Sequence, residues 1–232
     1  MFTGIVQQVG IIEAIKDSLN ARSYVVKLPL TFCLGINIGD SVANNGCCLT
    51  LVKAQFFYQG AEFTSEQIAQ LQLETYLEIT PDTYALLSFD LISTTLNLTN
   101  LGSLEIGSQV NIERSFKIGS EVGGHIMSGH IDQKIPVINL YQKDNIYQLE
   151  FALPQELKPF VFDKGFVGID GMSLTVSSIT PQGFTVNLIP ETLAKTTIST
   201  KNIGDFVNLE IDNNTKVIVN TVNNYLQNLK LS

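Results

Sequence analysis

Short runs of alternating or β-branched apolar residues dominate the pattern of hydrophobic positions along the chain. Gly, Pro, Asn and Asp interrupt these runs, which is typical of strands joined by tight turns. About six such runs fall in each half of the chain, which favours a small closed barrel or a sandwich, since both folds protect their edge strands. The clearest runs are LTLV at 49–52, VNIE at 110–113, YQLEFAL at 147–153, LTVS at 174–177 and VNLE at 207–210.

The chain also repeats itself at fixed spacings. The block GDSVANNGCCLTLV at 39–52 aligns with KGFVGIDGMSLTVS at 164–177, an offset of 125 residues. MFTGIV at 1–6 aligns with IMSGHI at 126–131 at the same offset. Two further blocks, FDLISTTLNLTN and LEIGSQVNIE, recur at an offset of 97 residues as VNLIPETLAKTT and KNIGDFVNLE. Chance is a poor explanation for several blocks that recur in one order, so the sequence predicts two related β-domains.

These two domains are predicted to differ in length. The first is expected at 1–120 and the second at 121–212, with the link near Gly119–Gly124. Because the two offsets differ by 28 residues, the first domain must carry an insertion, which we expect at about 54–84.

Two segments outside the repeat are predicted to be helical. Within the insertion, Ser65 is expected to cap a helix that runs through Gln72 and ends before Pro81. The tail at 213–232 carries an apolar stripe with helical spacing, and Asn and Gln fill the opposite side. Either the chain's own barrel or another subunit would bury this stripe. Its members are Ile218, Val222, Tyr225 and Leu229.

The composition narrows the class of protein. Of the 232 residues, 44% are hydrophobic and 16% are charged, which excludes a disordered chain. The net charge of −8 argues against a nucleic-acid or anionic-membrane partner, since no excess of basic residues is present. No apolar run is long enough for a membrane helix, and the first residues lack the pattern of a secretory signal. The 54–84 insertion holds five acidic residues and no basic ones, so the remainder carries only −3.

The cysteines and histidines are few. An odd set of three, Cys33, Cys47 and Cys48, disfavours a disulfide framework and favours a reducing compartment, for which we expect the cytoplasm. With only His125 and His130 and no CxxC spacing, no metal site is predicted.

Five blocks taken together closely resemble the riboflavin synthases of the α-subunit type. The blocks are MFTGIV, SVANNGCCLT, VNIERSFKIGSEVGGHIMSGHI, KGFVGIDGMSLTV and LIPETLAKTTI, and they span nearly the whole chain except the insertion. The resemblance implies an all-β fold of two pseudo-symmetric six-stranded Greek-key β-barrels in tandem. It also implies that the C-terminal α-helix assembles a homotrimer, with each active site between the N-terminal barrel of one subunit and the C-terminal barrel of the next.

The reaction implied by this resemblance joins two identical substrates. A four-carbon unit passes between two molecules of 6,7-dimethyl-8-ribityllumazine, which gives riboflavin and 5-amino-6-(ribitylamino)uracil. No cofactor is implied, and an association with lumazine synthase is left open.

The resemblance also implies a set of substrate-binding residues. Extended backbone beside a glycine can approach the flat ring closely, and clustered hydroxyl, amide and carboxylate groups suit the polyol tail. In the first half the implied residues are Gly4, Ile5, Val6, Ser41, Cys48, Leu49, Thr50, Asp90, Leu91, Ile92, Ser93, Thr94 and Thr95. In the second half they are Gly129, His130, Ile131, Lys164, Ser173, Leu174, Thr175, Asn187, Leu188, Ile189, Pro190, Glu191 and Thr192.

Six residues are candidates for catalysis. Each also has a structural interpretation: a buried Cys is commonly inert, a Lys can lie in a solvated turn, and an Asp before a helix can cap it. Of the two histidines, five residues apart and so on opposite sides of a strand, we expect one to be structural. We favour the second for the site, because it lies in a repeated block. The candidates are Cys48, Ser173, Thr175, Lys164, Asp212 and His130.

One position departs from the family, and two other functions remain open. Thr94 stands where the family usually has an acidic residue, which weakens the expectation for the first pocket. A non-catalytic lumazine or flavin antenna protein would usually lose polar site residues in one half, whereas this chain keeps paired residues in both. A β-barrel interaction module that recruits a partner through the acidic insertion would bind no small ligand tightly.

Overall fold

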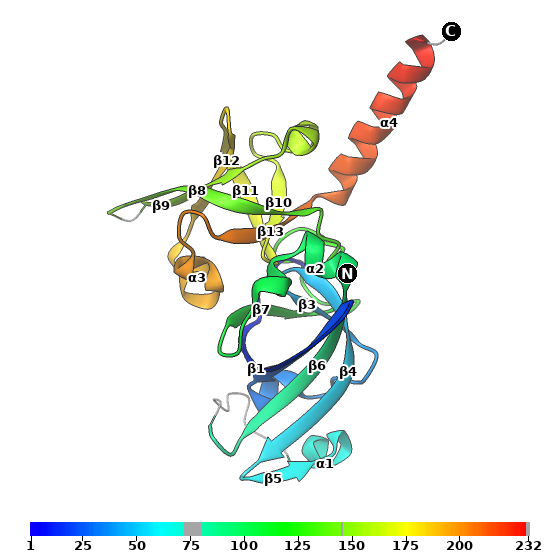
Figure 1. Ribbon diagram of the computed structural model, residues 1–232, viewed down its shortest axis with the longest axis vertical. Helices are drawn as coiled ribbons and strands as arrows, with labels where there is room; N and C mark the ends of the chain where they lie inside the picture. Colours follow the sequence, from blue (N-terminus) through cyan, green and yellow to red (C-terminus); the bar gives the residue numbers. More distant parts are fainter. Residues whose placement is uncertain (72–79, 145, 231–232) are drawn as a thin grey trace.

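The computed structural model describes residues 1–71, 80–144 and 146–230, and it confirms two closed antiparallel β-barrels followed by a helix (Figure 1). In the first barrel the strands neighbour one another in the order β3-β7-β1-β2-β6-β4, and the β3–β4 pairing closes the ring. Its strands are β1 (Gln8–Ser18), β2 (Ala21–Leu28), β3 (Ser41–Asn44), β4 (Cys47–Tyr58), β6 (Tyr84–Ile92) and β7 (Gln109–Arg114).

The second barrel repeats the first strand by strand. Its closed order is β10-β11-β12-β9-β8-β13, which matches the first barrel at every position. In both barrels the second strand leads to a strand that is not its neighbour, as the expected Greek key requires. Its strands are β8 (Gln133–Lys143), β9 (Ile146–Ala152), β10 (Phe166–Ile169), β11 (Met172–Ile179), β12 (Gly183–Leu188) and β13 (Phe206–Ile211).

Each barrel has its own hydrophobic core. Alternate residues of β2 are buried, including Tyr24, Val26 and Leu28, because successive side chains of a strand point to opposite faces. In β9 the same alternation buries Leu149 and Phe151. Separate clusters around these residues fill the two interiors, in keeping with the strands expected from the alternating pattern in the sequence.

Short helices fill the connections at equivalent places in the two barrels. After β6 comes α2 (Ser93–Leu98) followed by η2 (Asn100–Ser103), and after β12 come α3 (Pro190–Lys195) and η4 (Thr197–Thr200). Two further short helices are η1 (Leu30–Cys33) and η3 (Gln155–Phe160). The strand periodicity did not predict these turns, which are too short to show a helical pattern.

The insertion lengthens one hairpin of the first barrel. Strand β4 runs on to Tyr58 and pairs with β5 (Ala61–Phe63), and α1 (Ser65–Gln70) follows. The helix cap is Thr64 and not Ser65 as predicted. The Thr64 hydroxyl accepts a hydrogen bond from the backbone N–H of Gln67, and the Gln67 side chain accepts one from Thr64 N–H, which is a capping box. The predicted continuation through Gln72 lies outside the described residues.

This hairpin lies at the end of the first barrel that faces away from the second barrel (Figure 1). Aromatic contacts join this hairpin to the neighbouring strands: the rings of Phe57 on β4 and Tyr84 on β6 stack with centroids 4.8 Å apart, and Lys27 Nζ lies 4.1 Å from the Tyr84 ring centroid. The described part of the insertion is therefore remote from the junction of the barrels, where the candidate site is found.

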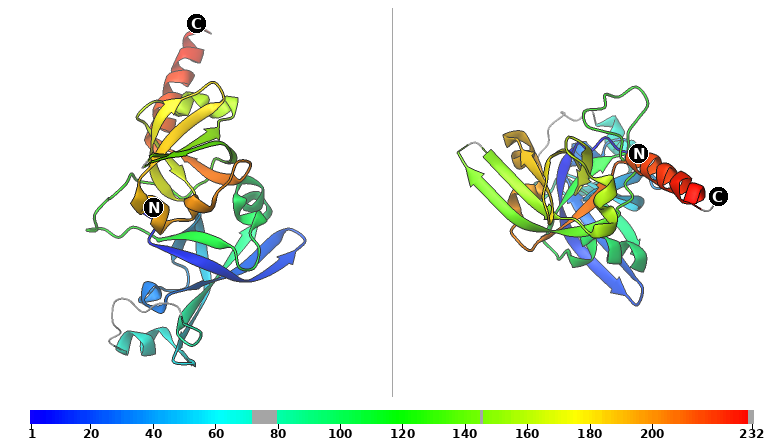
Figure 2. Two further views of the ribbon diagram at one scale, coloured as in Figure 1. Left: turned by 90° about the vertical axis from the view of Figure 1, so that its left-hand side faces the viewer. Right: turned by 90° about the horizontal axis from the view of Figure 1, so that it is seen from above.

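The C-terminal helix α4 (Asn213–Lys230) projects away from both barrels (Figures 1 and 2). Asp212 caps it, since its Oδ2 accepts hydrogen bonds from Thr215 N at 2.8 Å and Thr215 Oγ1 at 2.9 Å. Of the predicted apolar stripe, Ile218 and Tyr225 are each 64% exposed, so the stripe does not pack on the chain's own barrel. Within the described residues, no helix combines the length and apolar character needed to cross a membrane.

Candidate functional site

The segments that precede the two barrels cross over at their junction. Residues 1–6 precede β1, yet Gly4 O accepts a 2.8 Å hydrogen bond from Ser173 N in the second barrel. Residues 127–131 precede β8, yet Gly129 O accepts a 2.8 Å hydrogen bond from Cys48 N in the first barrel. The repeat had paired Gly4 with Gly129 correctly, but it could not show that each glycine serves the opposite barrel.

Both glycines are required by the close approach of these backbones. Gly4 and Gly129 have φ of +74° and +82°, a conformation that other residues rarely adopt. A Cβ atom on Gly4 would lie 2.5 Å from Ser173 Cβ, and one on Gly129 would lie 2.5 Å from Cys48 Cβ. Each crossing segment therefore packs directly against the strand that carries a catalytic candidate, Ser173 or Cys48.

A pocket of about 230 Å³ opens where the first segment meets the second barrel. It brings together eight predicted residues from three separate parts of the sequence: Gly4, Ile5, Val6, Ser173, Leu174, Ile189, Glu191 and Thr192. It also includes Met172, Lys195 and Thr196, which the sequence analysis missed. Lys195 and Thr196 lie one helical turn after Glu191 and Thr192 in the same repeated block, and that spacing was the available signal.

The equivalent place on the first barrel has the same elements. Ile131 packs on the core of the first barrel, just as Val6 packs on the core of the second, so both crossing segments are anchored alike. Cys48 on β4 lies beside the segment Gly129–Ile131. From the repeat we expect the exposed start of α2 to lie there too, as the start of α3 does at the second barrel. The predicted residues of this half on β6 and α2 are Asp90, Leu91, Ile92, Ser93, Thr94 and Thr95.

Several predicted residues occupy positions that limit what they can contribute. The side chains of Leu49, Leu91, Leu174 and Leu188 are buried, so only their backbone can meet a ring. Asp90 and Asn187 are exposed and accept cross-strand hydrogen bonds from Ser23 Oγ at 2.6 Å and Gln148 Nε2 at 2.8 Å. On the paired strands β3 and β4, Thr50 lies opposite Ser41, and on the equivalent strands β10 and β11, Thr175 lies opposite Phe166.

The structure brings His125, rather than the favoured His130, to Ser173. His125 Nδ1 lies 2.7 Å from Ser173 Oγ, and its ring stacks on Phe166 with centroids 5.3 Å apart. Neither histidine lies in a strand, and His130 is exposed. The sequence did not single out His125, because this residue immediately precedes the repeated block IMSGHI at 126–131.

Burial lowers the pKa of His125 below its usual value, although the charge of Asp212 partly opposes this. The folded protein therefore holds a neutral imidazole next to the Ser173 hydroxyl near neutral pH. A neutral imidazole can accept a proton from that hydroxyl, which makes the pair a candidate for proton transfer.

The lowered pKa of His125 predicts a loss of stability in mild acid. As the pH falls below the ordinary histidine pKa of about 6.5, the unfolded chain takes up a proton that the folded chain does not. Unfolding is thereby favoured, and the free energy of unfolding declines until the pH passes the folded-state pKa. Urea titrations between pH 7.5 and 5 should show this decline in the native chain.

The control for this prediction is the other histidine. A His125→Phe variant, which can keep the stack on Phe166, should lose that part of the pH dependence, while His130→Phe should retain it. Equal pH dependence in the native chain and in His125→Phe would contradict the assignment.

The two charged candidates lie on the turns around this site. Lys164 is exposed with φ of +64°, and its N–H donates to Val176 O at 3.0 Å. Asp212 caps α4, as its structural interpretation required, and its charge acts on His125. Within the described residues, no cluster of three or more His, Cys, Asp or Glu is arranged to hold a metal ion.

Two hairpin turns meet back to back between the sites. Asn45–Gly46 joins β3 to β4, and Asp170–Gly171 joins β10 to β11, with all four residues at positive φ. A Cβ on Gly46 would lie 2.6 Å from Gly171 N. Because Cys48 and Ser173 each follow two residues after these glycines, the contact sets the spacing of the two site strands.

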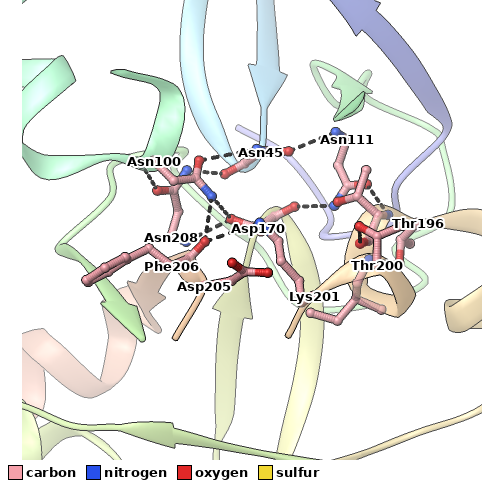
Figure 3. A network of polar contacts seen from close by, with 12 residues as sticks. Asn45, Asn100, Asn111, Asp170, Thr196, Thr200, Lys201, Asp205, Phe206 and Asn208 are labelled. Atoms are coloured by element: carbon pink, nitrogen blue, oxygen red, sulfur yellow. Dashed lines mark hydrogen bonds and ion pairs between the residues drawn. The ribbon is translucent and has the colours of Figure 1, made fainter. Parts of the chain in front are cut away.

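A buried polar network surrounds the paired turns (Figure 3). Asp170 is fully buried, and its Oδ1 accepts hydrogen bonds from Asn208 N at 2.7 Å and Asn100 Nδ2 at 2.9 Å. Its Oδ2 lies 3.5 Å from Lys201 Nζ. Burial raises the pKa of Asp170, and the nearby Lys201 charge opposes this. The equivalent of Asp170 in the first barrel is Asn45, whose Oδ1 accepts from Asn111 N at 2.8 Å, so the network is only approximately symmetric.

Comparison with known proteins adds independent information. The model of the lumazine binding domain family matches residues 3–115 and 128–212. Riboflavin synthase of Escherichia coli (strain K12) is 40% identical over 227 residues, which cover 97% of this chain and 93% of that protein. Riboflavin synthase of Bacillus subtilis (strain 168) is 31% identical over 212 residues, which cover 91% of this chain and 85% of that protein.

Solved structures with the same architecture include ligand complexes of LumP. The crystal structure of LumP complexed with riboflavin superposes with a TM-score of 0.72 at 26% identity, and the match covers 92% of this chain and all of that one. LumP complexed with 6,7-dimethyl-8-(1'-D-ribityl) lumazine gives a TM-score of 0.71 at 24% identity with the same coverage. These two superpositions agree with the two-barrel fold described above.

Proposed function

Because the chain belongs to the riboflavin synthase family of lumazine-binding domain proteins, we propose that it forms riboflavin from two molecules of 6,7-dimethyl-8-ribityllumazine. One molecule gives a four-carbon unit to the other, and 5-amino-6-(ribitylamino)uracil is the second product. The observation that carries the proposal is the crossed pocket, in which Gly4–Val6 line the second barrel beside Ser173. The repeat predicts a related pocket on the first barrel, and two related pockets suit a reaction between two identical substrates.

The chemistry of the pocket matches the two parts of the substrate. The backbone of Ile5 and Val6 would hydrogen-bond to the edge of the flat ring, while Gly4, whose N–H and C=O are bonded within the protein, would let the ring approach closely. Glu191, Thr192, Lys195 and Thr196 line the pocket and would bind the hydroxyl groups of the ribityl chain. In the first barrel, Gly129, His130 and Ile131 would take the ring, while Ser93, Thr94 and Thr95 would hold the chain.

The reaction requires proton removal from a methyl group of one ring and addition of a nucleophile to the other. We assign proton transfer at the second pocket to His125 and Ser173, whose Nδ1 and Oγ lie 2.7 Å apart. Cys48 takes the place of Ser173 at the first pocket. Thr175, Lys164, Asp212 and His130 remain proposed contributors, and alignment of the two rings would supply much of the rate.

The proposed enzyme is a cytoplasmic homotrimer. The exposed apolar stripe of α4 supports assembly, since two further copies of this chain would bury it. The proposed partner is a small-molecule substrate. The acidic net charge supports this, because it disfavours binding to a nucleic acid or to an anionic membrane.

A turnover assay tests the proposed function directly. Purified protein mixed with 6,7-dimethyl-8-ribityllumazine alone should form riboflavin, which is followed by its absorbance and green fluorescence. Replacing Ser173 by Ala should lower kcat by about 10²-fold, which is at the low end for loss of a proton-transfer group.

The matched control for Ser173→Ala lies on the same strand. Ser178 Oγ lies 2.8 Å from Thr185 Oγ1 and is not among the residues that line the pocket, so Ser178→Ala should keep the native rate. Tight binding of the lumazine without turnover would instead support the antenna function, and absence of binding would support the interaction module.

A further inference from the structure

Two buried glutamates hold the crossing segments by their backbones. Glu113 Oε1 on β7 accepts hydrogen bonds from Thr3 N at 2.6 Å and Thr3 Oγ1 at 2.9 Å, and Oε2 accepts from Gly4 N at 3.1 Å. Glu210 on β13 makes the equivalent contacts with Ser128 N at 2.6 Å, Ser128 Oγ at 2.7 Å and Gly129 N at 3.1 Å. Their exposed fractions are 3% and 2%, so water cannot replace these bonds.

The contacts of these glutamates require a carboxylate. Two of the three donors named above for each glutamate are backbone N–H groups whose direction is fixed, and the third is a hydroxyl that donates as well. A glutamine in the same place would turn its NH₂ group toward one of these donors. Two donors would then face each other, and neither would have an acceptor. The residue type is therefore set by the segment that it holds.

Each glutamate belongs to one barrel but binds a segment that is hydrogen-bonded to the other barrel. Glu113 belongs to the first barrel, but Gly4 O accepts from Ser173 N of the second. Glu210 belongs to the second barrel, but Gly129 O accepts from Cys48 N of the first. In both cases the carboxylate binds the N–H of a glycine, and the C=O of the same glycine accepts a hydrogen bond from the strand that carries Ser173 or Cys48.

We propose that Glu113 and Glu210 are positioning residues that act crosswise, Glu113 on the pocket of the second barrel and Glu210 on the pocket of the first. Neither touches the substrate. Each keeps a ring-binding backbone segment at the distance from Ser173 or Cys48 that the reaction requires. This inference rests on the proposed function only in treating the two pockets as lumazine sites.

Hydrogen exchange read by mass spectrometry tests the crossed effect without turnover. In Glu113→Gln, the peptide around Ser173 should exchange about tenfold faster, because the Gly4 carbonyl is no longer held against its N–H, while the peptide around Cys48 keeps the native rate. Glu210→Gln should give the reverse. Glu150→Gln is the control, because Glu150 lies on β9, accepts from Thr180 Oγ1 at 2.6 Å and bonds neither crossing segment in the contacts described, so it should change neither peptide.

Milder variants keep the test valid if the amide variants fail to fold. Thr3→Val and Ser128→Ala remove one donor from each glutamate and should give the same crossed pattern with a smaller amplitude. Faster exchange in the variant's own barrel only, in both peptides equally, or in neither would overturn the proposal. A protein that fails to make riboflavin but shows the crossed pattern would refute the proposed function and leave the positioning role standing.

Discussion

Replacement of Asp170 by Ala is expected to lower the free energy of unfolding by about 3–5 kcal/mol, the range found when one partner of a buried ion pair is removed. The substitution takes away the buried acceptor shared by Asn208 N and Asn100 Nδ2 and removes the carboxylate partner of Lys201, whose Nζ also donates to Phe206 O at 3.2 Å. Since the paired turns hold both barrels, the loss should shift the midpoint of urea unfolding for the whole chain. The slope of the transition should remain unchanged.

The control for Asp170→Ala lies nearby on the same barrel. Asp205 is exposed and its Oδ2 accepts one hydrogen bond, from Asn202 N at 2.8 Å, so Asp205→Ala should cost less than about 1 kcal/mol. Asp170→Asn copies Asn45 of the first barrel and should fall between the two. An unfolding midpoint for Asp170→Ala equal to that of Asp205→Ala would show that the network adds little to stability.

Deletion of residues 215–232 is expected to convert the protein into monomers and to lower riboflavin formation by about 10²-fold or more. In the homotrimer implied by the resemblance, each site lies between barrels of two subunits, and misplacement of a partner by about 1 Å is enough for a loss of that size. Light scattering would give the mass, and the lumazine assay would give the rate.

Point variants separate assembly from the role of α4 within its own chain. The deletion also removes the 2.7 Å ion pair between Lys216 and Asp132. Replacement of Ile218, Val222 and Tyr225 by Gln keeps this pair and the Asp212 cap, and should still give inactive monomers. Asn223→Gln with Asn224→Gln on the opposite side should leave the mass and the rate unchanged. Native mass and native rate after the deletion would exclude α4 as the assembly element.

The sequence predicted those parts of the fold that depend on local pattern. Alternation in LTLV and LTVS identified the strands that carry Cys48 and Ser173, and the repeat identified their equivalence. The cap of α1 was misplaced by one residue, because both Thr64 and Ser65 suit an N-cap and only the chain geometry selects between them.

The site was harder to predict because it depends on contacts between distant segments. No pattern around Gly4 indicates that Ser173 donates a hydrogen bond to it across two barrels. His125 likewise has no local signal, since its significance comes from the 2.7 Å contact with Ser173 and from burial. Glu113 and Glu210 were visible only as members of aligned strands, although their occurrence at buried ends of VNIE and VNLE was itself unusual for a charged residue.

The crossing of residues 1–6 and 127–131 has a consequence for the origin of the chain. A single barrel of this kind would lack the crossing segment that completes its pocket. A second copy would have to supply that segment, by reciprocal exchange as in a domain-swapped pair. Such a pair falls apart on dilution. Fusion of the two copies into one polypeptide makes the exchange intramolecular, so that each pocket keeps its crossing segment at any protein concentration. Gene duplication would then have removed a dependence on dimer formation and freed each half to diverge toward its own part in the reaction.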